Sequence, residues 1–115
     1  MADLPRLIDL HLAGARADER GRSAEVLVHD GPLRQSILAL TSGTELGEHN
    51  SPDAASLQVL VGRVQVTGLE PAVVGTGQLV VLTHRRHAVV ALEDAVFLLT
   101  AVTGVGQATE AARRG

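Results

Sequence analysis

Residues 54–67, with the sequence A-A-S-L-Q-V-L-V-G-R-V-Q-V-T, decide the fold. They form two runs rich in valine and leucine on either side of Gly62, and such side chains suit a pleated, half-buried surface. A glycine between two strands indicates a bend or a close approach of two backbones. We therefore expect a β-hairpin here. His49 precedes this unit and His87 follows it, so the pattern outlines a small barrel with a candidate site inside.

The two-residue period extends in both directions from this unit. In residues 33–41, Ile37 and Ala39 fall on one face of the expected strand, and Leu38 and Leu40 fall on the other. Further strands are expected at 24–29, 44–50, 72–74, 78–82, 87–91 and 95–103. Short strands at regular spacing between Gly, Pro and Asp turns are typical of an all-β sandwich or barrel, not of parallel βαβ units.

The first twenty residues have helical periodicity instead. Asp3 suits the N-cap, Pro5 is tolerated in the first turn, and Gly21 suits a left-handed stop, which predicts a helix over residues 4–20. Its apolar face carries Leu4, Leu7, Ile8, His11, Leu12 and Ala15. We expect an N-terminal helix in residues 1–21, one barrel in 22–103 and a flexible tail in 104–115.

Composition excludes several classes of function. The 115 residues suit one domain, and a hydrophobic fraction of 45% excludes a disordered chain. Phe97 is the only aromatic residue, so platforms for stacking bases or sugars are missing. A net charge of −3 without a basic stripe argues against nucleic-acid binding, and the absence of cysteine excludes disulfides and thiolate zinc sites. No apolar window suggests a signal peptide or a membrane span, so we expect a cytoplasmic protein without a membrane partner.

The spacing of the first histidine resembles the first motif of the cupin superfamily, whose pattern is G-x5-H-x-H-x3,4-E-x6-G. Gly43, His49 and Gly62 fall at the expected positions. Ser51 stands where the motif has its second histidine, and Ala55 stands where it has glutamate.

The second cupin motif, G-x5-P-x-G-x2-H-x3-N, is represented by Gly77 and His87, with one residue fewer between them. Thr83, Arg85 and Ala91 stand near the proline, glycine and asparagine positions. The resemblance covers roughly residues 33–102 and implies a jelly-roll barrel, a double-stranded β-helix like that of small bacterial cupins, with a degenerate metal motif. Cupin metal sites often serve isomerases and dioxygenases.

Two imidazoles from different strands meet only if a barrel closes around them. Imidazole suits Fe, Zn, Ni or Mn, although a stable site wants three or four protein ligands. Regular alternation puts Glu45 and Ser51 on the face of His49, which allows a two-histidine, one-carboxylate metal site of Glu45, His49 and His87. Asp53 could replace the carboxylate only after a bulge. The other interpretation is two pocket histidines without metal. The expected ligand pocket comprises His49, His87, Ser51 and Leu57.

The remaining polar residues fit simpler roles. His84, Arg85 and Arg86 form a basic loop cluster, which is either solvated or meets an anionic ligand at the barrel mouth. We expect His11 to be a packing residue on the helix face, and no serine to have a base beside it as in a Ser-His-Asp triad.

Three functions remain open. The first is a small-molecule binder or sensor with a partial or lost metal site, which the departures from the motif favour. The second is a metal-dependent enzyme of isomerase or dioxygenase type that uses His49 and His87. The third is an assembly module. We also expect a homodimer, with the helix and first strands at its interface. The competing arrangement is a monomer whose helix caps its own barrel.

Overall fold

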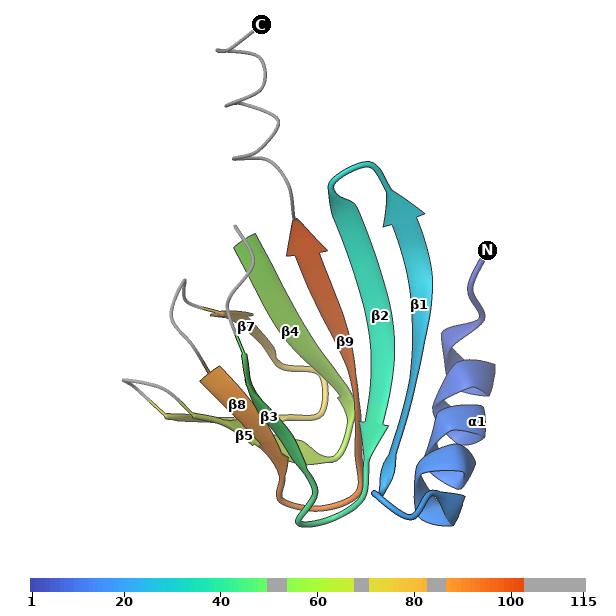
Figure 1. Cartoon of the computed structure of the whole chain (residues 1–115), viewed down its shortest axis with the longest axis vertical. Coiled ribbons are helices and arrows are strands. Elements are labelled where there is room, and N and C mark those ends of the chain that lie inside the picture. Colours follow the sequence, from blue (N-terminus) through green and yellow to red (C-terminus); the bar gives the residue numbers. More distant parts are fainter. Residues whose placement is uncertain (50–53, 68–70, 83–86, 103–115) are drawn as a thin grey trace, which may run out of the picture.

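The computed structural model describes residues 1–49, 54–67, 71–82 and 87–102. Within these ranges the chain forms one helix followed by nine strands (Figure 1). Their bounds are α1 Leu4–Ala17, β1 Arg22–Asp30, β2 Leu33–Leu40, β3 Glu45–His49, β4 Ala54–Val61, β5 Arg63–Val66, β6 Ala72–Gly75, β7 Leu79–Leu82, β8 His87–Ala91 and β9 Ala95–Val102.

The helix begins as its sequence predicts and ends earlier. The Asp3 carboxylate accepts a hydrogen bond from the Arg6 backbone N–H at 3.4 Å, and Pro5 lies in the first turn, so the predicted N-cap is confirmed. The helix ends at Ala17 and not at residue 20, with Asp18 as its C-cap. The Asp18 carboxylate accepts from the backbone N–H groups of Arg20 and Arg22, and this local turn takes the place of the last helical turn.

The strands form two antiparallel sheets. One has five strands in the order β1-β2-β9-β4-β7, and the other has four in the order β3-β8-β5-β6. Consecutive strands such as β4 and β5 therefore lie in different sheets. The expected jelly-roll arrangement with a short N-terminal helix is confirmed (Figure 1). None of the helical segments described has the length and apolarity that crossing a membrane requires.

Aliphatic side chains from both sheets fill the space between them, around the single aromatic ring. Phe97 on β9, Leu57 on β4 and Val64 on β5 are each fully buried. The same cluster contains Leu40, Val59, Val66, Val74, Leu82, Val89, Ala91 and Ala95. A core of Val, Leu and Ala around Phe97 is what the composition requires.

A second apolar cluster lies on the outer face of the five-stranded sheet, under α1. Ile37 and Ala39 from β2 and Val96 from β9 are fully buried there, together with Ala15 of the helix. Leu7, Ile8 and Leu12 pack against them, so the apolar face of the helix is covered by its own sheet. The predicted face assignment of β2 is confirmed. The helix face therefore packs on its own sheet, and the expected homodimer stays a prediction.

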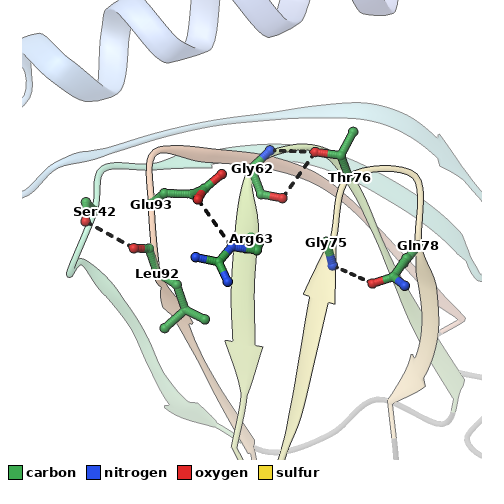
Figure 2. A network of polar contacts seen from close by, with 8 residues as sticks. All are labelled: Ser42, Gly62, Arg63, Gly75, Thr76, Gln78, Leu92 and Glu93. Atoms are coloured by element: carbon green, nitrogen blue, oxygen red, sulfur yellow. Dashed lines mark hydrogen bonds and ion pairs between the residues drawn. The ribbon is translucent and has the colours of Figure 1, made fainter.

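Gly62 marks a crossing between sheets, and the expected hairpin at residues 54–67 is wrong. β4 pairs with β7 and β9, whereas β5 pairs with β6 and β8. Gly62 has φ of +89°, and a Cβ there would meet the backbone of Asp94 and Ala95. Its N–H donates to Thr76 Oγ1 at 3.0 Å, and the Thr76 hydroxyl donates to the Gly62 carbonyl at 3.2 Å (Figure 2).

Further polar contacts tie the turns at this end of the barrel, which we call the base. Arg63 Nε lies 3.2 Å from Glu93 Oε2, and the Gly75 N–H donates to the Gln78 side-chain oxygen at 2.8 Å (Figure 2). Asp94 joins three elements at the base. Its carboxylate accepts from the Ser42 backbone N–H at 2.9 Å and from Arg16 Nε of the helix at 2.9 Å. These two contacts, the Ser42 bond first, lower the pKa of Asp94.

We expect Gly62→Ala to destabilise the protein by about 2–5 kcal/mol, the sum of left-handed backbone strain and an overpacked contact. Gly43→Ala is the matched control, because Gly43 has φ of +84° and its Cβ would meet nothing within 4 Å. Gly43→Ala should lose about 1–2 kcal/mol of stability, because only the left-handed backbone strain applies there. Urea unfolding of both variants measures the difference, and equal losses would mean that the close approach at Gly62 costs nothing.

The lowered pKa of Asp94 predicts a pH-dependent contribution to stability. A carboxylate with a folded-state pKa below its unfolded value stabilises fully above the unfolded value, and the contribution disappears as pH falls through the folded-state pKa. Asp94→Asn should therefore be less stable than wild type at about pH 7, with the gap narrowing below about pH 3.8, the ordinary value of this group. Urea midpoints measured across this range test it. A gap independent of pH would contradict the prediction.

Candidate functional site

The two histidines of the expected site lie at the end of the barrel opposite the base, which we call the mouth. His49 is the last residue of β3, and His87 is the first residue of β8. These strands pair antiparallel, and their register puts the Cα of His49 opposite the Cα of His87. β4 and β9 also reach this end, at Ala54 and Val102, so the mouth is built from strand ends of both sheets (Figure 1).

The backbone of β3 is irregular between Glu45 and His49. The β3–β8 register shifts between Leu46 and His49, so β3 contains one residue more than β8 over this interval. Glu45 pairs with Val90, three residues from His87, and these positions belong to opposite faces of a regular strand. The Glu45 side chain is exposed, whereas Leu46 packs against the inner core. The register shift interrupts the regular alternation that the sequence predicted between Glu45 and His49.

The expected three-ligand metal set of Glu45, His49 and His87 stays a prediction. Across the described residues, no group of three or more His, Cys, Asp or Glu side chains gathers in one place. Ser51 and Asp53 lie outside the described residues, as does the cluster of His84, Arg85 and Arg86.

The fourth predicted pocket residue, Leu57, is a core residue in this structure. Its side chain is fully buried between the two sheets, in the cluster that contains Phe97. A hollow of about 280 Å³ lies close by, at the mouth end of the five-stranded sheet. It is mainly apolar and is lined by Ala54, Ala55, Ser56, Val81, Leu82, Thr100 and Val102. Gln35 donates to the Thr100 hydroxyl beside it at 3.1 Å.

A polar cluster that the sequence did not predict lies between α1 and β1. His11 Nδ1 lies 2.7 Å from Ser23 Oγ, and His11 Nε2 lies 3.0 Å from Glu25 Oε1. His11 is 6% exposed and is the only buried polar residue among those whose burial the structure describes. A carboxylate only accepts hydrogen bonds, so Nε2 is the donor to Glu25, and the Ser23 hydroxyl can donate to or accept from Nδ1.

The Ser23–His11–Glu25 cluster has the residue types of a catalytic triad but lacks room for a substrate. A Cβ at Gly14 would lie 2.9 Å from Ser23 Oγ, so the helix backbone covers the hydroxyl. The expectation that no serine has a base beside it is wrong, while the packing role of His11 fits. The sequence signal was present, since Ser23 and Glu25 are two apart on one strand face. Their meeting with His11 depends on where the helix docks.

Structures of known proteins share this architecture. A conserved protein of unknown function from Streptococcus pyogenes has 30% sequence identity and a TM-score of 0.68, over 75% of this chain and 77% of its own. A cupin superfamily protein from Desulfitobacterium hafniense has 15% identity and a TM-score of 0.69, over 76% of this chain and 82% of its own.

A salicylate 1,2-dioxygenase from Pseudaminobacter salicylatoxidans gives a TM-score of 0.74 at 16% identity, over 91% of this chain but 35% of the dioxygenase. At 16% identity, this similarity shows a shared fold alone. No protein-family model matches the chain, and no curated protein matches it in sequence.

We expect His11→Ala to cost about 1–3 kcal/mol, because Ser23 and Glu25 lose their shared partner at the helix–sheet contact. His29→Ala is the control, since His29 is exposed and contacts only Arg34 among the contacts described for it. The stability that His29→Ala loses should stay within about 0.5 kcal/mol. Thermal and urea unfolding measure both, and equal values would show that the buried cluster contributes nothing specific.

Proposed function

Because the chain has the fold of cupin proteins, we propose that it is a small-molecule binding or sensing barrel with a partial or lost metal site. The proposed ligand site is the barrel mouth, around His49 and His87. Homodimer formation and a cytoplasmic location, both expected from the sequence, stay predictions.

The observation that carries this proposal is the direct register of His49 and His87 on neighbouring strands. Residues directly opposite in an antiparallel pair are the closest cross-strand neighbours, with Cα atoms about 4.5–5.5 Å apart. Two imidazoles at directly opposite positions of neighbouring strands would offer both hydrogen-bond donors and acceptors to a ligand. An apolar barrel wall with a few such polar groups is the usual composition of a small-molecule pocket.

The donor set favours binding over metal catalysis. Ser51 and Ala55 occupy the positions where the cupin motif has its second histidine and its glutamate. Glu45, the carboxylate expected to replace them, is exposed and pairs with Val90. Two imidazoles alone fall short of the three or four ligands that a stable site needs. A metal-dependent enzyme of isomerase or dioxygenase type is the alternative, and it would need further ligands beyond the described residues.

Protein purified without an affinity tag or added metal distinguishes the two functions. We expect elemental analysis to find well under one equivalent of iron, zinc, nickel or manganese per chain. One full equivalent, reduced by His49→Gln or His87→Gln, would support the enzyme instead.

The ligand itself is sought by native mass spectrometry of protein prepared under gentle conditions. We expect a small-molecule adduct that disappears on denaturation. His49→Gln and His87→Gln should each reduce its occupancy by about tenfold, the effect of losing one hydrogen bond of about 1.4 kcal/mol. His29→Gln, an exposed histidine at the β1–β2 end, serves as the matched control and should retain it. An adduct that survives the loss of both mouth histidines would contradict the proposed site.

A further inference from the structure

The helix leaves part of the outer face of the five-stranded sheet uncovered. Among the described elements, α1 packs mainly on β1, β2 and β9. Val81 on β7 is 74% exposed, and Leu79 on the same strand is 63% exposed. Both alternate with Val80, which packs against the inner core, so their side chains point to the outer face. Large exposed apolar side chains that gather on one face indicate a surface that another segment covers.

The apolar hollow of about 280 Å³ lies on this uncovered part of the face. Ser56 of β4 pairs with Thr100 of β9 and with Val81 of β7. Ser56 alternates with Leu57, whose side chain is buried in the inner core, so these three paired side chains point to the outer face. Val102 follows Thr100 by two residues and lies on the same face. The residues that line the hollow carry no charge.

The chain continues directly from this hollow. Val102 is the last residue of β9 and lines the hollow, and residues 103–109 follow it with the sequence T-G-V-G-Q-A-T. This segment carries no charge, and Val105 is the only apolar side chain larger than alanine in residues 103–115. Charged residues return at Glu110. An uncharged segment therefore lies next in sequence to an uncharged apolar face, and the charged residues beyond it suit solvent.

We propose that residues 103–109 pack on the outer face of β4 and β7, with the Val105 side chain in the hollow. In the order of the sheet, β7 lies two strands from β9, which is about 10 Å across the sheet. Three extended residues also span about 10 Å, so the chain from Val102 can bring Val105 to Val81. Gly104 allows the sharp change of direction that this path needs at the end of β9.

A segment of the same chain suits this hollow better than a second molecule. The segment is joined to a residue that lines the hollow, so docking costs the entropy of closing a short loop and not that of bringing two molecules together. With α1 on β1 and β2, and residues 103–109 on β4 and β7, both halves of the outer face are covered on either side of β9. The free tail expected from the sequence then begins at Glu110.

Cysteine pairs in the full chain test the proposal, because the chain contains no cysteine of its own. Val105→Cys combined with Val81→Cys should form an intramolecular disulfide under mild oxidation, since docking brings the two Cα atoms into the range of about 4.4–6.8 Å that a disulfide spans. Val105→Cys combined with Leu33→Cys is the matched control. Leu33 is 37% exposed and pairs directly with Val102 on the other side of β9, so a free segment reaches it at least as easily.

We expect the disulfide to Val81→Cys to form at least about tenfold faster than the disulfide to Leu33→Cys, because docking raises the effective concentration of one thiol near the other. Equal rates would mean that the segment does not prefer this face, which would overturn the proposal. Disulfides between two chains in place of the intramolecular one would assign the face to a second copy and would also overturn it.

Thermal unfolding gives a second test that needs no cross-link. Val105→Asp should lower the thermal midpoint by about 3 °C or more, because it places a charge in the apolar hollow. Ala112→Asp introduces the same charge beyond residue 109 and should leave the midpoint within about 1 °C of wild type. Equal midpoints of the two variants would overturn the proposal. Because neither test involves the mouth histidines, their results are independent of the proposed ligand site.

Discussion

The pairing of β9 with two strands at once is the constraint on which the rest of the structure depends. All eight residues of β9 pair with β2 on one side, and its partners on the other side span β4 from Ala54 to Val61. β9 is buried on both faces, with Phe97 in the core between the sheets and Val96 under the helix. The C-terminal strand therefore organises both apolar clusters, and the two clusters stabilise the same ladder from opposite sides.

The two ends of the barrel differ in chemistry. At the base, turns are joined by a glycine in close contact with a neighbouring backbone, by the Asp94 carboxylate and by the Thr76 hydroxyl. These contacts hold the turns together at the base. At the mouth, His49 and His87 are paired at neighbouring strand ends of the four-stranded sheet, and an apolar hollow lies at the same end of the five-stranded sheet. Binding residues of proteins are commonly carried at the ends of elements that a scaffold positions, and the mouth consists of such strand ends.

Predictions from local pattern succeeded wherever one segment contained the whole signal. Asp3 caps the helix as expected, because an N-cap needs only its own first turn. Ile37 and Leu40 fall on the predicted faces of β2, because alternation is a property of one strand. The alternation predicted between Glu45 and His49 is interrupted, because the register shift in β3 is visible only against β8. The helix ended early because Asp18 bonds to residues beyond it, which competes with helical hydrogen bonding.

The sequence by itself determined the class of the fold, the extent of most strands and the two histidine positions at the mouth, because periodicity, caps and motif spacing are local. Only the tertiary structure decided that Gly62 joins two sheets and not two strands of a hairpin, since strand pairing depends on which distant edge is free. Closure of the barrel likewise set His49 opposite His87, and helix docking set His11 between Ser23 and Glu25. These contacts join residues far apart in the chain, and their geometry is fixed by how whole elements pack.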